Sequence, residues 1–129
     1  MSDNLGPAAV PTTIPEVLRS AAGVVLKRGY AVGVRHHATD GSVCAIGAVE
    51  EALDIDWVED KPLAMDALKA LAKHLQSEVI AGGDTITTVA GWSNSLIQWL
   101  GSMEAAGAAL ARTFEAAADA LEGQKEHNL

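Results

Sequence analysis

Residues 30–53, YAVGVRHHATDGSVCAIGAVEEAL, decide the fold of this chain. They begin as a short apolar run with β-branched residues at alternate positions, and Asp40-Gly41 supplies the chemistry of a tight reversal. Residues 42–44 are the expected returning strand. Residues 45–53 have helical spacing, and we expect Glu50 and Glu51 to point outward. We therefore predict a two-stranded hairpin over 30–44 that leads into a helix. Gly47 inside that helix costs about 1 kcal/mol against Ala, so we expect another backbone to pass close by.

Helical patterns flank this segment on both sides. Residues 13–28 carry apolar side chains three and four apart behind a capping box of Thr13 and Glu16. A further helix is predicted from the Asp60-Lys61-Pro62 start to about residue 78, and the last one over 102–122. Residues 85–90 are β-branched enough for a short strand or an extended loop, and 91–99 form a turn and a short helical segment. Because a hairpin alone is marginal, we predict a mainly α fold, with four to five helices packed around it.

The length of 129 residues predicts a single domain. We expect a flexible leader over 1–12, a globular helical domain over 13–122 and a flexible tail over 123–129. Only 4% of the residues are aromatic, so the core must be mostly aliphatic.

Charge and cysteine content narrow the classes of function. The formal net charge of −8 disfavours a nucleic-acid groove and an anionic lipid surface, which both need a basic face. A single Cys makes no internal disulfide, and the first residues lack the pattern of a signal peptide. No run of 18 apolar residues indicates a membrane span. We predict a cytoplasmic protein with no nucleic-acid and no membrane partner.

Cys44 is the first candidate for chemistry, because it lies where the returning limb meets a helix start. Amides at such a position lower a thiol pKa, and His36 or His37 would be the base of a small cysteine hydrolase or transferase. The glycine and aromatic context of known cysteine proteases is missing. A buried thiol that packs as a small hydrophobe is the favoured interpretation.

A metal or phosphate site is disfavoured by spacing. His36 and His37 with Asp40 are metal-ligand types, but adjacent strand residues point to opposite faces. Residues 54–60 lack the turn glycine and closing Glu of a calcium loop, and no Gly-Lys-Ser/Thr follows Gly82-Gly83. We expect no metal and no cofactor.

The acidic residues between 50 and 60 and the three tryptophans are the candidates for binding. The carboxylates are typical of a solvated helix end, but would also suit a basic partner or an acidic mimic of DNA. We expect at least two of Trp57, Trp92 and Trp99 to be buried. Trp92 with Asn94 is the candidate lining of a partner surface, together with Arg35 and Asp40 near the hairpin.

Two stretches also resemble a known family. Arg28-Gly29-Tyr30, followed by DGSVCAIGA over 40–48, is similar to the RGW and DG-x-x-CA-x-GA segments of small uncharacterised proteins of actinobacteria and their phages, mycobacteriophages included. Trp92-Ser93-Asn94 and the Ala-rich last helix resemble the W-N-D turn and closing helix of that family. The family brings no established activity, so the resemblance implies the organisation and the host. Tyr30 occupies the position at which the family usually has Trp, and Asn94 occupies the position of the family's acidic residue.

These observations favour a non-enzymatic protein that binds another protein, in a host-modulating or regulatory role. The Ala-rich last helix is a candidate surface for self-association. The cysteine hydrolase or transferase and the acidic DNA mimic are the alternatives.

Overall fold

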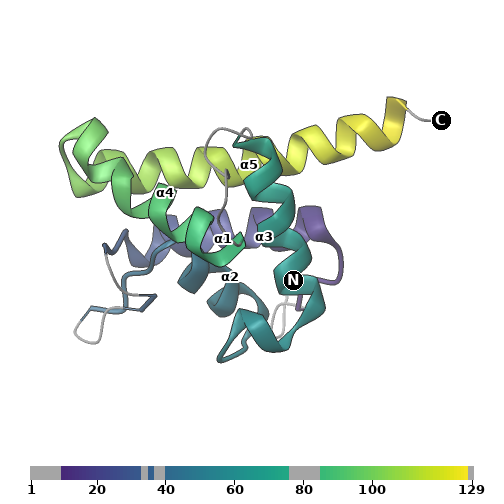
Figure 1. Ribbon diagram of the computed structural model, residues 1–129, viewed down its shortest axis with the longest axis horizontal. Coiled ribbons are helices and arrows are strands. Elements are labelled where there is room, and N and C mark those ends of the chain that lie inside the picture. The colour runs from purple at the N-terminus through teal and green to yellow at the C-terminus, as the bar shows by residue number, and fades with distance from the viewer. Residues whose placement is uncertain (1–9, 33–34, 37–39, 76–84, 128–129) are drawn as a thin grey trace.

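The computed structural model describes residues 10–32, 35–36, 40–75 and 85–127, with the backbone alone for 124–127. The fold is mainly α, as predicted. Five helices and one 3-10 turn occupy the described residues (Figure 1): α1 Ile14–Arg28, α2 Ala45–Leu53, η1 Val58–Asp60, α3 Pro62–His74, α4 Thr85–Leu100 and α5 Met103–His127. No described helix combines the length and the apolar character that crossing a bilayer requires.

The start of α1 confirms the predicted capping box. The Thr13 hydroxyl accepts a hydrogen bond from the Glu16 amide at 3.3 Å, and the Glu16 carboxylate accepts one from the Thr13 amide at 3.3 Å. The Thr12 amide donates to the same carboxylate at 2.9 Å and, as the largest influence, lowers the pKa of Glu16. These bonds satisfy amides that a helix start would otherwise leave without partners.

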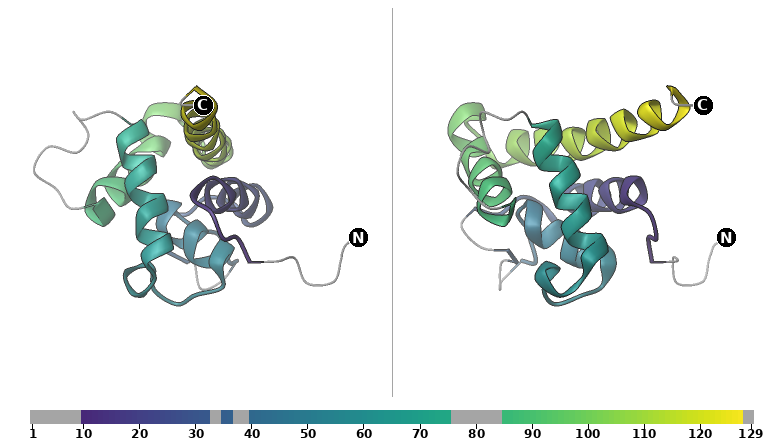
Figure 2. Two further views of the ribbon diagram at one scale, coloured as in Figure 1. Left: turned by 90° about the vertical axis from the view of Figure 1, so that its right-hand side faces the viewer. Right: turned by 45° about the vertical axis from the view of Figure 1, so that its right-hand side comes forward.

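The core is aliphatic, as the composition requires. α1 and α5 run alongside each other, α2 packs under α1, and α3 and α4 close the side (Figures 1 and 2). Arg19 of α1 pairs with Asp119, at 2.7 Å, and with Glu122 of α5. The largest completely buried apolar side chains, apart from valines, are Leu18, Ile46, Leu68, Leu71, Leu110 and Phe114.

The predicted hairpin over 30–44 is wrong, because the described residues contain isolated bridges and no strand. Val43 pairs with Tyr30 in the parallel sense and with His36 in the antiparallel sense. The Ala31 amide donates to the Val43 carbonyl, and the Val43 amide to the Gly29 carbonyl, both at 2.9 Å. Val43 therefore bonds to two separate segments and forms no continuous β-ladder with either of them. Helix α2 begins two residues after it.

Asp40 holds the turn that leads back to Val43. Its Oδ1 accepts hydrogen bonds from the Ser42 amide at 2.9 Å and from the Ser42 hydroxyl at 2.7 Å. A short Asx-type side chain fixes its own backbone in this way. The predicted role of Asp40 in the reversal is thus supported, whereas residues 37–39 lie outside the described residues.

The end of the chain is more helical than predicted. Residues 85–90 belong to α4, because Val89, Trp92 and Leu96 bury one helical face, and that burial outweighs the β propensity of the threonines. Trp92-Ser93-Asn94 is consequently not a turn. α5 continues to His127 past the predicted end at Gly123. α3 is described to His74, and the rest of its predicted span lies outside the described residues.

Candidate functional site

The backbone of Arg35 lies directly against the first turn of α2. Its carbonyl oxygen accepts a hydrogen bond from the Cys44 amide at 3.2 Å. A Cβ built on Gly47 would be 1.8 Å from that same oxygen, so only glycine fits there. The expected close approach of a second backbone to Gly47 is therefore confirmed. The contact places Arg35 beside α2, where its Nη1 donates a hydrogen bond to Glu50.

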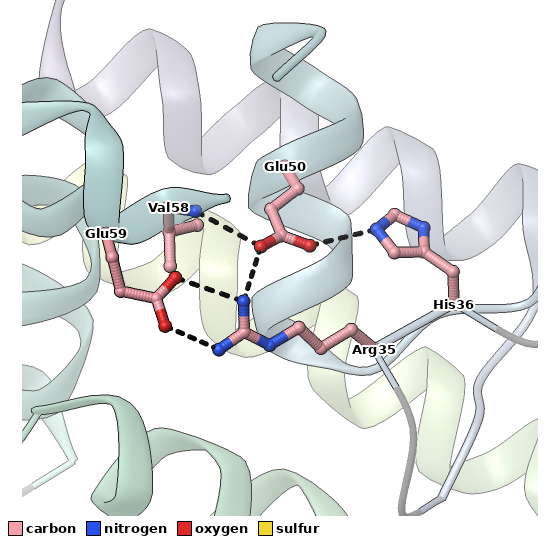
Figure 3. A network of polar contacts seen from close by, with 5 residues as sticks. All are labelled: Arg35, His36, Glu50, Val58 and Glu59. Atoms are coloured by element: carbon pink, nitrogen blue, oxygen red, sulfur yellow. Dashed lines mark hydrogen bonds and ion pairs between the residues drawn. The ribbon is translucent and has the colours of Figure 1, made fainter. Parts of the chain in front are cut away.

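Glu50 is buried beneath this loop, with 1% of its side chain exposed. Its Oε2 accepts hydrogen bonds from Arg35 Nη1 at 2.8 Å and from the Val58 amide at 3.1 Å (Figure 3). Its Oε1 lies 2.9 Å from His36 Nε2. We call Arg35, His36, Glu50, Glu59 and the Val58 amide the Glu50 cluster. The prediction that Glu50 points outward is wrong, because three partners from the loop and η1 meet its carboxylate.

Arg35 joins the buried part of the cluster to the surface. Its Nη1 and Nη2 donate to the two oxygens of Glu59 at 3.1 and 2.8 Å (Figure 3). Glu59 is the largest influence that raises the pKa of Arg35, and Arg35 in turn lowers the pKa of Glu59. The guanidinium also lies 5.4 Å from the centroid of the Trp57 ring, in a cation–π contact. Three side chains thus fix one guanidinium.

Cys44 is a poor candidate for a nucleophile in this geometry. It is the N-cap residue of α2 and only 3% exposed, and burial raises the pKa of its thiol despite the Gly47 and Ile46 amides, which act in the opposite direction. The His36 ring contacts Glu50 rather than the thiol. His37 lies outside the described residues. A thiol with a raised pKa is mostly protonated at neutral pH and is a weak nucleophile.

A groove of about 430 Å³ brings three of the predicted residues together. Arg35, Cys44 and Asn94 line it, along with apolar and small residues of α2 and α4. Asp40 lies outside its lining. Trp92, the predicted centre of a partner surface, is 9% exposed and packs in the core. Within the described ranges, no three His, Cys, Asp or Glu side chains gather as metal ligands would.

Ser93 is a structural residue that the sequence did not reveal. It is completely buried in α4, and its hydroxyl accepts a hydrogen bond from the Ala45 amide at 3.1 Å. It therefore caps α2 from a distant helix, because Cys44 provides no side-chain cap. The Ser93 carbonyl accepts a hydrogen bond from the Tyr30 hydroxyl. Only the occurrence of a small hydroxyl residue between buried positions hints at this role.

The tryptophans differ from the expectation that at least two are buried. Trp57 is 56% exposed and Trp99 is 66% exposed, so only Trp92 belongs to the core. Trp57 has Arg35 on its ring and acidic residues around it, whereas Trp99 lies near Leu100 and Met103 at the corner between α4 and α5. Both indoles are available to a partner.

The comparison with known proteins defines the family of the chain. The model described as "Family of unknown function (DUF6197)" matches residues 9–122, and the chain belongs to this family. No curated protein and no solved structure matches it. The Glu50 cluster, the Ser93 cap and the packing of Gly47 all lie within the matched residues.

Proposed function

We propose that the protein is a non-enzymatic binding module that recognises a basic segment of another protein through the surface around Trp57. The observation that carries this proposal is an indole that is 56% exposed and yet held on a fixed guanidinium. Tryptophan and arginine are the residue types that most often dominate the energy of protein interfaces.

The Glu50 cluster keeps the Trp57 surface in one arrangement before any partner arrives. Glu50 and Glu59 both accept hydrogen bonds from the Arg35 guanidinium, which also lies against the indole. A side chain that is already ordered loses less conformational entropy on binding. The cluster therefore supports recognition, although it performs no chemistry itself.

The charge around Trp57 supports a basic partner. Asp54, Asp56 and Asp60 line a groove of about 300 Å³ together with the indole, Ile55 and Lys61, so three carboxylates face a single cation there. Carboxylates around an exposed indole favour Lys and Arg side chains by Coulomb attraction. The net charge of −8 would also speed the encounter with a basic protein.

The reactive groups support a binding role over a catalytic one. Burial raises the pKa of the Cys44 thiol, and the carboxylate of Glu50 has three protein partners. The resemblance of residues 28–30, 40–48 and 92–94 to proteins of actinobacteria and their phages supports a biological setting. We propose an actinobacterial or phage origin, action in the host cytoplasm and a regulatory or host-modulating role.

The test is capture from an actinobacterial lysate by immobilised wild-type protein and two matched tryptophan variants. We expect a basic protein that the wild type and Trp99→Ala retain and that Trp57→Ala loses. Asp56→Lys should weaken retention of the same protein, and added salt should weaken it further. Equal retention by Trp57→Ala and the wild type, with both folded by circular dichroism, would refute the proposal.

A further inference from the structure

A second groove, of about 360 Å³, lies between α3 and the C-terminal half of α5. Figure 2 shows α5 continuing past α3 in both views. The apolar part of the lining consists of Ala70 of α3 and of Ala117, Ala120 and Leu121 of α5. The polar part comes from α3 alone and consists of Lys69, Lys73 and His74. The groove therefore combines an apolar wall with a row of basic side chains, and no carboxylate of the described residues lines it.

The two lysines of this groove are without an ionic partner among the described residues. Lys69 and Lys73 lie one turn apart on α3, and both are exposed. No described carboxylate is within ion-pair distance of either, whereas Arg19, Arg28 and Arg35 each have a carboxylate partner. Like charges at this spacing destabilise a helix slightly, and a bound anion would remove that repulsion.

The acidic residues of α5 lie on the side of the helix away from the groove. Asp119 and Glu122 pair with Arg19 of α1, the first of them at 2.7 Å. Glu115 precedes Asp119 by four residues, so helical geometry places it on that same side. The groove is thus locally basic, although the formal net charge of the chain is −8.

We propose that the groove binds a carboxylate that carries an unbranched alkyl chain, which is the chemistry of a medium-chain fatty acid. The carboxylate pairs with Lys69 and Lys73, and the chain lies on the alanines and Leu121 of α5. The groove volume is near the lower limit of ligand pockets, roughly 300–1,000 Å³, so one alkyl chain fits it better than a two-chain lipid. Trp57 does not line this groove, so fatty-acid binding and the proposed partner binding fail independently.

An NMR titration of the full chain with decanoate tests the proposal. Backbone amide signals of residues 69–74 and 117–121 should shift and reach saturation, with a Kd on the order of 1 mM for a groove of this size. Two control compounds separate the contributions of charge and chain. Decan-1-amine has the same chain with the opposite charge, and butyrate has the same carboxylate on a short chain. Each should bind at least about 10-fold more weakly than decanoate.

Variants identify the side chains responsible. Lys69→Gln/Lys73→Gln should weaken decanoate binding by about 5-fold or more, because two partly exposed ion pairs are lost. Lys27→Gln, on an exposed site of α1, is the control and should bind as the wild type does. Ala120→Glu and Ala120→Gln differ in charge but hardly in size. The Glu variant should bind decanoate more weakly than the Gln variant, since its carboxylate repels the ligand.

Three results would overturn the proposal. One is a decanoate titration in which the shifts do not saturate by about 10 mM or map to another part of the chain. Another is equal affinity for decanoate and decan-1-amine, which would mean that the groove does not select an anion. The third is a Lys69→Gln/Lys73→Gln protein that is folded by circular dichroism and binds decanoate as tightly as the wild type.

Discussion

Replacing Gly47 by alanine tests how tightly the Arg35 loop is fitted to α2. The new Cβ would lie 1.8 Å from the Arg35 carbonyl oxygen and 2.7 Å from its carbonyl carbon. These are backbone atoms, so no side-chain rotation relieves the clash. The loop must move by roughly 1 Å or more, because ordinary contacts between such atoms begin near 3.5 Å.

The expected cost combines three terms. Overpacking of a buried site costs about 1–3 kcal/mol and occasionally more, and contact with rigid backbone belongs at the upper end. Loss of the hydrogen bond from the Cys44 amide to Arg35 adds about 1 kcal/mol. Alanine returns about 1 kcal/mol through its higher helix propensity. The net prediction for Gly47→Ala is a loss of about 3 kcal/mol in the free energy of unfolding.

Urea unfolding followed by tryptophan fluorescence and circular dichroism measures this loss. Gly91→Ala is the matched control, because Gly91 lies in α4 and a Cβ there meets no atom within 4 Å. The control should be up to about 1 kcal/mol more stable than the wild type. A Gly47→Ala protein as stable as the wild type would refute the proposed fit of the loop.

Three further outcomes follow from the same geometry. The Cys44 thiol should react with iodoacetamide at least about 100-fold more slowly in the native protein than in urea, since burial raises its pKa and blocks access; equal rates would contradict this. Ser93→Ala should lower the free energy of unfolding by about 1–2 kcal/mol, because the Ala45 amide loses its acceptor; an unchanged urea midpoint would contradict the cap. Arg35 lowers the pKa of Glu59 in the folded protein below the value of 4.5 that the unfolded chain has. The pair therefore stabilises the fold fully above pH 4.5, and this stabilisation is lost as the pH falls through the lower pKa of the folded state. Glu59→Gln should therefore be slightly less stable than the wild type at neutral pH and equal to it in strong acid, and a gap that persists in acid would contradict the pair.

The helices were predictable because their signals are local. The capping box and the apolar spacing of α1 lie within one short segment, and the predicted helix over 45–53 has the bounds that α2 shows. Gly47 also gave a correct expectation of a close backbone, although Gly23 and Gly91, which lie inside helices as well, meet no atom within 4 Å.

The errors came from non-local contacts. Residues 30–44 have strand propensity, but bonds from Val43 to two separate segments replace the hairpin. Residues 85–90 have the same propensity, and burial of Val89 and Trp92 makes them helical. β propensity reports how a side chain fits its surroundings, and those surroundings come from distant parts of the chain.

The candidate site was only partly visible in the sequence. Arg35 and Asn94 were predicted as binding residues, and the structure does bring them to one groove. Glu50 was expected to face solvent because a carboxylate on a helix usually does. Its burial depends on Arg35 and on the Val58 amide, and neither has a pattern that links it to Glu50 before the chain is folded.

A double-mutant cycle between Arg35 and Glu50 tests most directly whether their partly buried ion pair fixes the loop on α2 and holds the guanidinium against Trp57. The free energies of unfolding of the wild type, Arg35→Met, Glu50→Gln and the double variant give the coupling between the two side chains. The structure predicts a favourable coupling of about 2 kcal/mol, because the Glu50 carboxylate is 1% exposed and lies 2.8 Å from the guanidinium. Additive effects within about 0.5 kcal/mol would contradict the account.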